Sequence, residues 1–358
     1  MPPEESALVP VHFKARPEDF VVEEIPAYPP SGSGEHVHVT FRKRLCTTEE
    51  AVRLLARALG ADPRGCGYAG QKDKVGVTTQ SATFPVPMKV DPAPLLDTFT
   101  DDRVTVLSWA RHNGKLKPGH LHGNRFTVLL RDVPHEAMAP ITEVVLSSKG
   151  GFPNAFGPQR FGRDGDNPER ALAWLSGKNR GPRDKREQRM LFSSLQALLF
   201  NELLERRVRD GSWQAVLPGD VAKKHDTGGL FTVPTSGADL EDAERRAREH
   251  LVSATGPLFG ATMRWPEGDA LAIELGVLEA RGLEARSFDA FRALGEGTRR
   301  PLRVFADEVA VEPVEGGLCV RFVLPKGTYA TTLLGRACRL VETRYDRASE
   351  PTEADPAA

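Results

Sequence analysis

The sequence has few cysteines and no long apolar run. Its four cysteines, Cys46, Cys66, Cys319 and Cys338, are scattered over 358 residues, and no two of them form the C-x-x-C spacing typical of a metal site. We therefore expect reduced thiols in a cytoplasmic protein. No apolar stretch approaches the roughly 18 residues that a membrane span needs, and the acidic start, MPPEESALVP, is not typical of a signal peptide.

The chain also lacks an overall excess of positive charge. Its net charge is −1, which by itself gives no support for nucleic-acid binding. The charges are unevenly distributed, however, because 16 Lys and Arg but only eight Asp and Glu lie between Arg103 and Arg189. A strongly basic third of a chain can place a cationic face against a polyanion, although a solvated surface has the same composition.

Hydrophobic periodicity predicts interspersed strands and helices. Strands are predicted within 11–25, 36–44, 103–112, 123–133 and 299–341, and helices at 47–60, 136–151, 188–211 and 239–251. In 36–44 the apolar Val37, Val39 and Phe41 share one face, and Thr47 and Glu50 can form a capping box for the helix that follows. Alternating strands of this kind, mixed with helices, indicate an α+β fold rather than regular βαβ units.

A glycine pattern in the segment 65–70, GCGYAG, matches the G-x-G-x-x-G of dinucleotide-binding loops, and Asp91 follows about 20 positions after it. That motif requires a strand before the glycines and a helix that begins among them. Here a predicted helix precedes the glycines, and the following KDKVGVTTQSATF favours extended chain. We therefore reject a dinucleotide cofactor and interpret the glycines as permitting a tight turn and a close backbone approach beside Asp73.

Asp73 lies between Lys72 and Lys74. If residues 71–75 are extended, the lysines point one way and the aspartate the other, and the two cations favour its ionised form. Such a carboxylate can serve as nucleophile, base or metal ligand. Taken alone, the pattern is more typical of a turn aspartate in a surface ion pair.

Several further segments occur in a fixed order around Asp73. They are PEDFVVEE (17–24), GHLHGNRF (119–126), FPNAFGPQRFG (152–162), PGDV (218–221) and LPKGTYAT (324–331). With these segments the chain, from Phe13 to about Leu340, resembles the TruD family of tRNA pseudouridine synthases, which modify uridine 13 of tRNA. The resemblance implies an isomerase, an intramolecular transferase, that acts on tRNA and needs no cofactor or metal.

The resemblance also implies roles for individual residues. Asp73 would be the catalytic carboxylate, acting either as nucleophile or as base, and Asn154 and Phe156 would line the uridine pocket. Lys14, Phe20 and Glu24 match a motif near the active site, and Lys72 and Arg160 are further substrate-binding candidates. Arg160 either supports that pocket or ties loops together. The phosphate contacts would come from Lys115, Lys117, Arg125 and Arg163. This chain differs from some family members directly after Asp73. Those members carry a KDRHAVT-like segment, whereas this chain has Lys74, Val75, Gly76 and Val77.

The implied fold has two domains. A discontinuous catalytic domain, 1–178 and 300–358, would hold a mixed, largely antiparallel sheet flanked by helices, and an inserted α/β TRUD domain would span 179–299. We expect a monomer with no obligatory protein partner and no membrane association. Two alternatives stay open: a non-catalytic RNA-binding or RNA-folding protein on the same scaffold, and a metal-dependent RNA hydrolase. The hydrolase would use His36, His38, His112, His120 and His122, but no Cys or carboxylate completes a recognisable ligand set.

Overall fold

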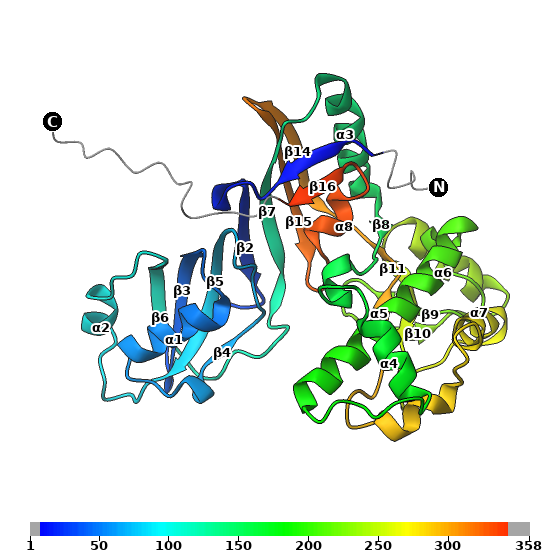
Figure 1. Cartoon of the computed structure of the whole chain (residues 1–358), viewed down its shortest axis with the longest axis horizontal. Coiled ribbons are helices and arrows are strands. Elements are labelled where there is room, and N and C mark those ends of the chain that lie inside the picture. The colour runs from blue at the N-terminus through cyan, green and yellow to red at the C-terminus, as the bar shows by residue number, and fades with distance from the viewer. Residues whose placement is uncertain (1–7, 343–358) are drawn as a thin grey trace. The chain divides into compact units, whose positions relative to one another are not determined.

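The computed structural model describes residues 8–342, which divide into two compact units (Figure 1). The inserted unit comprises residues 150–305, and the discontinuous unit comprises 8–149 and 306–342. These divisions differ from the expected boundaries after residues 178 and 299. The reason is that α4 (Asn167–Leu175) packs along α5 (Lys185–Arg209), which joins the segment before residue 178 to the inserted unit. The expected domain ends at 1–7 and 343–358 lie outside the described residues.

The discontinuous unit is built on a ten-stranded sheet. Its main path runs β14-β15-β7-β2-β5-β3-β6, while β1 pairs with β7 and β16, and β4 pairs with β5. The strands are β1 (Pro10–Phe13), β2 (Phe20–Pro26), β3 (His36–Arg44), β4 (Gly67–Tyr68), β5 (Val77–Pro85), β6 (Val104–His112), β7 (Leu121–Arg131), β14 (Asp307–Val314), β15 (Gly317–Pro325) and β16 (Arg339–Glu342). Within 8–342 only β1–β16 and β2–β5 pair in parallel, which confirms the predicted mixed, largely antiparallel sheet.

Helices accompany this sheet. They are α1 (Thr48–Ala58), α2 (Ala93–Asp97), α3 (His135–Ser147) and α8 (Ala330–Leu334). The predicted capping box of α1 is present, since Thr47 Oγ1 accepts the Glu50 N–H and the Glu50 carboxylate accepts the Thr47 N–H. Leu55 of α1 packs in one apolar cluster with Val39 and Phe41 of β3, and all three are fully buried. The buried face of α1 therefore packs against β3.

The inserted unit contains α4, α5, α6 (Ala238–Arg248) and α7 (Gly268–Glu279), with a four-stranded antiparallel sheet in the order β10-β9-β11-β12. These strands are β9 (Val221–Lys224), β10 (Leu230–Thr232), β11 (Val252–Leu258) and β12 (Thr298–Pro301); a separate pair joins β8 (Phe152–Pro153) to β13 (Arg303–Val304). The predicted apolar stripe of α5 is buried, as Leu191, Leu195 and Leu199 show. The periodicity analysis did not find α4, α7 or strands β9–β11.

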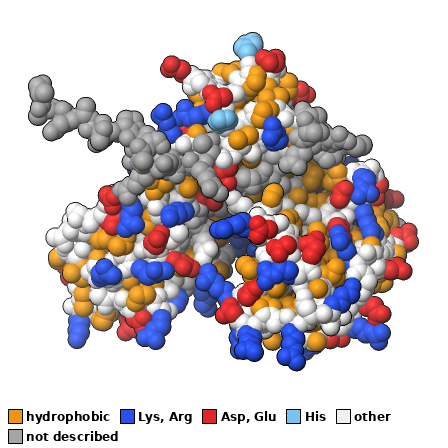
Figure 2. Space-filling model, viewed as in Figure 1, with side chains coloured by type: hydrophobic (Ala, Val, Ile, Leu, Met, Phe, Trp, Pro, Cys, Tyr) orange, Lys and Arg blue, Asp and Glu red, His pale blue; other side chains and the backbone are white. Residues whose placement is uncertain are grey.

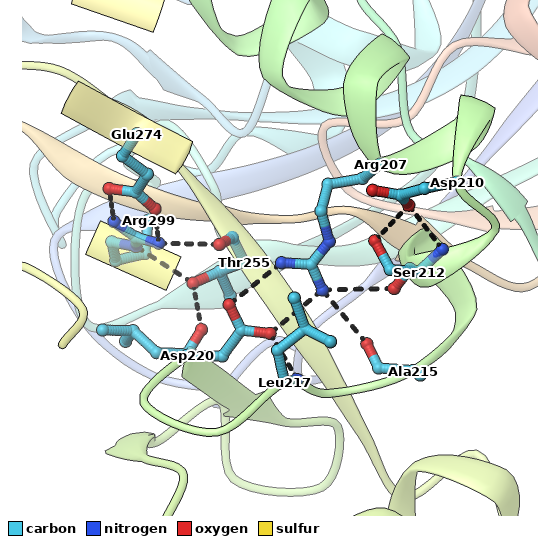
Figure 3. Close-up of polar contacts among 10 residues, drawn as sticks. Arg207, Asp210, Ser212, Ala215, Leu217, Asp220, Thr255, Glu274 and Arg299 are labelled. Atoms are coloured by element: carbon cyan, nitrogen blue, oxygen red, sulfur yellow. Dashed lines mark hydrogen bonds and ion pairs between the residues drawn. The ribbon is translucent and has the colours of Figure 1, made fainter. Parts of the chain in front are cut away.

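Two buried ion pairs cross the core of the inserted unit (Figure 3). Arg299 donates to both carboxylate oxygens of Glu274, at 2.6 and 2.9 Å, and also to Thr255. Arg207 donates to both oxygens of Asp220 at 3.0 Å. Burial raises the pKa of Glu274, and the hydrogen bonds from Arg299 oppose that rise. These charges are satisfied by one another, which indicates a structural role.

The fold bears on the expectations of reduced cysteines and of no membrane-spanning segment. All four cysteines are free thiols. Between residues 8 and 342, every helix is too short or too polar to span a lipid bilayer.

Candidate active site

Asp73 lies in the loop that leads into β5. Strand β5 begins only at Val77, so residues 71–75 belong to the loop and not to a strand. The Asp73 side chain is 44% exposed, whereas that of Lys72 is only 6% exposed. The carboxylate therefore faces solvent while its neighbour is directed inward.

Buried groups from α1 and β3 hold this loop. The Lys72 N–H donates to Thr48 Oγ1 (2.9 Å), and the Thr48 hydroxyl donates to Gln80 Oε1 (2.9 Å). On the other side, Lys43 Nζ donates to the main-chain oxygen of Asp73 (2.6 Å) and to that of Cys46 (2.7 Å). The exposed carboxylate of Asp73 thus belongs to a loop whose backbone is fixed by hydrogen bonds to Thr48 and Lys43.

Lys43 is a site residue that the sequence analysis missed. It is fully buried, and this burial lowers its pKa from 10.5 to about 8, against the opposing influence of Cys46 and Asp73. A signal for it existed, because Lys43 continues the alternation of Val37, Val39 and Phe41 on the buried face of β3. A lysine in phase with core residues needs a polar partner inside the protein.

Lys14 supplies the cation beside the carboxylate. Its Nζ lies 3.4 Å from Asp73 Oδ1, and its side chain is only 3% exposed. The ammonium also lies over the ring of Phe20, 4.2 Å from the centroid, and 5.0 Å from that of Phe13. The structure therefore brings together Lys14, Phe20 and Asp73, three of the residues that the sequence predicted to form one site.

Lys72 has a different partner from the one expected. Its Nζ donates to Glu24 Oε2 at 2.6 Å, and both side chains are buried. The second oxygen of Glu24 accepts the N–H of Ser81 in β5 (3.3 Å). The idea that Lys72 favours the ionised form of Asp73 directly is thus corrected: Lys72 and Glu24 tie β2 to the Asp73 loop, and Lys14 is the cation beside the Asp73 carboxylate.

The glycine pattern has a structural explanation. No helix begins among the glycines; the chain passes through β4 into β5, which confirms the rejection of a dinucleotide fingerprint. A Cβ atom at Gly67 would lie 2.2 Å from the main-chain oxygen of Leu116. Gly76, at φ +151°, approaches Phe20 so closely that a Cβ there would lie 2.8 Å from its main-chain oxygen. The glycines permit close approaches on both sides of Asp73.

The other predicted pocket residues lie in the inserted unit. Asn154 is buried and donates from its side chain to Pro301 O (2.9 Å), while Arg300 donates to both the main-chain and side-chain oxygens of Asn154. The Arg300 guanidinium lies 4.0 Å from the centroid of the Phe156 ring. Arg160 is exposed and donates to the Ser193 hydroxyl, which fits the interpretation that it ties loops together. Arg300 could not be predicted from the sequence, because it contacts Asn154, which lies 146 positions before it in the chain.

The four phosphate-contact candidates differ in their surroundings. Lys117 and Arg163 are exposed, and Lys115 is exposed with its Nζ donating to Arg64 O (2.9 Å). Arg125 is already engaged in an ion pair with Glu308 (2.9 Å). Figure 2 shows Lys and Arg side chains interspersed with Asp and Glu on the face in view, so no uniform basic patch covers that face. Lys115 and Lys117 are the stronger candidates.

The histidines do not form a metal centre of the kind that a hydrolase would need. Among residues 8–342, no group of three or more His, Cys, Asp and Glu side chains is placed to hold an ion. His38 and His112 lie with ring centroids 5.9 Å apart. Burial lowers the pKa of both, and a neighbouring imidazole adds to the effect in each case.

Comparisons with known proteins identify the family to which the chain is similar. The family described as tRNA pseudouridine synthase D (TruD) matches residues 7–169 and 183–337. The chain is 43% identical over 327 residues to a tRNA pseudouridine synthase D of Anaeromyxobacter sp., covering 90% of each chain. It is 42% identical over 347 residues to that of Thermus thermophilus, covering 96% of this chain and 92% of the relative.

A solved structure supports the fold. The crystal structure of the TruD protein of Methanosarcina mazei superposes with a TM-score of 0.72 over 94% of this chain and 95% of that one, at 22% identity. The family match spans both units, including the loop that carries Asp73. This chain therefore belongs to the TruD family of tRNA pseudouridine synthases, a family of isomerases.

Proposed function

We propose that the protein converts uridine 13 of tRNA to pseudouridine, with Asp73 as the catalytic carboxylate. The observation that carries the proposal is the setting of Asp73: a solvent-accessible carboxylate on a loop fixed by buried side chains, with the Lys14 ammonium 3.4 Å from Oδ1. A carboxylate held in this way is positioned before substrate arrives, which lowers the entropic cost of the reaction.

The chemistry needs no external reactant. The C1′–N1 bond of uridine breaks, the uracil turns, C5 bonds to C1′, and the proton lost from C5 is balanced by the proton gained at N1. Asp73 either attacks C1′ or removes the C2′ proton, and both routes use an ionised carboxylate. Lys14 Nζ lies 3.4 Å from Asp73 Oδ1, where its positive charge faces the carboxylate. Phe20, whose ring packs under the Lys14 ammonium, completes the apolar surroundings of the pair.

The choice of tRNA is supported by the names of the relatives and by the exposed lysines of the 113–120 loop. Position 13, and the contact of Asn154 and Phe156 with the uridine, come from the family resemblance and stay predictions. We further propose that the protein acts in the cytoplasm, which the four free thiols fit. We also propose that it is a monomer.

The direct test maps pseudouridine, position by position, in unmodified tRNA incubated with the purified protein and EDTA. We expect product at position 13 with wild type, none with a tRNA carrying cytidine there, and none with Asp73→Asn. Asp91→Asn is the matched control, because Asp91 is an exposed aspartate of the rejected glycine fingerprint; it should retain full activity. Unchanged product with Asp73→Asn would sink the assignment.

The same experiment separates the alternatives. Binding of tRNA without any product, across suitable tRNAs, would favour a non-catalytic RNA-binding protein. Strand cleavage in a parallel incubation without EDTA, absent when EDTA is present, would favour the hydrolase.

A further inference from the structure

A second pocket lies in the discontinuous unit, away from Asp73. Its volume is about 480 Å³, and it is formed where the loop after β2 meets the 113–120 loop between β6 and β7. Aromatic and basic side chains line it, namely Tyr28, His112, Lys115, Lys117 and His120. This size falls within the range of pockets that enclose a small organic ligand.

The Tyr28 pocket, as we call this 480 Å³ cavity, differs in charge from the larger hollow of ≈ 890 Å³ that lies along β6. The larger hollow is lined by Asp97, Asp101 and Asp102 and therefore does not suit an anion. None of the nine residues that line the Tyr28 pocket is acidic. Its charge comes from two lysines, so it suits an anionic ligand.

Tyr28 forms a fixed aromatic platform in this pocket. Its ring lies nearly parallel to that of His112, with centroids 5.8 Å apart and an interplanar angle of 19°, and it meets the ring of His120 edge-on at 5.7 Å. The Tyr28 hydroxyl lies 2.5 Å from His120 Nδ1. Although two imidazoles hold it, Tyr28 is still 38% exposed. An ordered and accessible aromatic ring is what a nucleic-acid base needs for stacking.

The walls of the pocket are tied together before any ligand binds. The Ser31 N–H donates to His112 Nδ1 (3.1 Å), and the Asn113 N–H donates to Ser31 Oγ (3.0 Å). Gly34 allows the loop to press against β6, because a Cβ there would lie 2.4 Å from the main-chain oxygen of His112. The platform is therefore preorganised, which lowers the cost of ordering on binding.

Both lysines lie where a phosphate backbone can reach them. Lys115 and Lys117 are exposed, and the one hydrogen bond of the Lys115 ammonium, to Arg64 O, leaves donors available to a ligand. No buried cation is present among the lining residues to enclose a small free anion. An aromatic platform next to exposed ammonium groups fits one unit of a polymer, with the base on the ring and the phosphate at the lysines.

We propose that the Tyr28 pocket is an accessory RNA subsite that binds one unpaired nucleotide of the substrate. The base stacks on Tyr28, and Lys115 and Lys117 contact the adjoining phosphates. This inference rests on the proposed function, because it takes the RNA substrate from there and adds a second point of contact.

The subsite lies far from the catalytic loop along the same sheet. The first residue of β3, His36, pairs with His112 at the pocket, whereas its last residue, Arg44, pairs with Val77 beside the Asp73 loop. Nine residues of strand at about 3.3 Å each place the two sites on the order of 25 Å apart. A substrate that reaches both sites must be a folded or extended RNA of several nucleotides, so the subsite selects for more than the target uridine.

The test measures tRNA affinity and its salt dependence alongside single-turnover pseudouridine formation. Lys115→Gln/Lys117→Gln should weaken binding about tenfold and make the slope of log K against log salt concentration less steep by roughly 1.5 to 2. Tyr28→Leu should weaken binding at least fivefold, whereas Tyr28→Phe, which keeps the ring, should bind almost as wild type. At subsaturating tRNA, the single-turnover rate should fall together with the affinity in Tyr28→Leu and in the lysine pair.

The control removes two positive charges elsewhere on the same unit. Arg53 and Arg57 are exposed on α1, and Arg53→Gln/Arg57→Gln should change affinity less than the lysine pair does. Thermal unfolding of each variant checks that the fold is intact. Wild-type affinity and salt slope in both Tyr28→Leu and the lysine pair would overturn the subsite while leaving the proposed function standing. Weakened binding in these variants, with no pseudouridine from wild type, would support the subsite and reject the proposed function.

Discussion

The ammonium nitrogen of Lys43 lies 2.6 Å from the main-chain oxygen of Asp73, and no part of Lys43 reaches solvent. A charge in the core of the discontinuous unit therefore holds the backbone of the exposed Asp73 loop. Burial lowers the pKa of Lys43 to about 8, so this charge is lost as the pH rises through about 8.

Lys43→Met should slow the chemical step and weaken the fold. The methionine leaves the main-chain oxygens of Cys46 and Asp73 without this donor, which should lower the free energy of unfolding by about 1–3 kcal/mol. In wild type, the single-turnover rate should decline as the pH rises through about 8, because Lys43 loses its proton there. In Lys43→Met that decline should be absent and the rate lower throughout. If the single-turnover rate declined equally with rising pH in both proteins, Lys43 would be excluded as the cause of the decline.

Lys14→Met should reduce the turnover rate by at least tenfold while leaving tRNA affinity nearly unchanged. The reason is that Lys14 places a buried ammonium beside Asp73 Oδ1. Lys74→Met is the matched control, because Lys74 is an exposed lysine adjacent to Asp73 in sequence. Steady-state and single-turnover kinetics with one tRNA measure both effects. Equal losses in the two variants would mean that general positive charge, rather than the Lys14 contact, supports the reaction.

Arg299→Met should destabilise the inserted unit by about 3–5 kcal/mol, because it leaves the buried Glu274 carboxylate without its partner. Replacing both residues, as Arg299→Met/Glu274→Leu, should cost less than the single change, since no unpaired charge then remains. On the surface of α6, Arg245→Met breaks exposed pairs with Asp242 and Glu249 and should cost far less than Arg299→Met. Urea unfolding followed by circular dichroism gives all three values; a small loss for Arg299→Met would contradict this account.

Acid should weaken the fold near the Tyr28 pocket. Burial lowers the pKa of His38 and His112 below 6.5, so the unfolded chain binds protons there more readily than the folded one. Their contribution to stability is therefore full above about pH 6.5 and is lost as the pH falls below it. His112→Asn keeps an acceptor for the Ser31 N–H but cannot titrate. The loss of unfolding free energy between pH 7.5 and 5.5 should be smaller in this variant than in wild type.

Local sequence signals predicted the parts of the fold that depend on local chemistry. The capping box of Thr47 and Glu50 located the start of α1, and the alternation of Val37, Val39 and Phe41 located β3. The same signals could not find α7, whose sequence GDALAIELGVLE is apolar around much of its surface and has no side-chain cap. The domain boundary expected after residue 178 came from the family resemblance, and no local signal could correct it, because the packing of α4 on α5 is a tertiary contact.

In the candidate site, too, some features could be predicted from sequence motifs, and the contacts between distant segments could not. Asp73, Lys14 and Phe20 were predicted together from motifs, and the structure confirms that they are neighbours. The pairing of Lys72 with Glu24 was not predicted, because it joins residues 48 positions apart through the parallel contact of β2 with β5. Sequence spacing gives the direction of a side chain on its own strand, but not which strand lies next to it.

The parallel pair of β1 with β16 also bears on synthesis. Pro10 of β1 is aligned with Arg339 of β16, so about 330 residues must be translated before this pair can form. At 5–20 residues per second, that is a delay of roughly 15 to 65 s. The inserted unit, by contrast, draws its helices and strands from the continuous segment 150–305. On the ribosome it can therefore fold first, while the sheet that carries Asp73 still waits for its last strand.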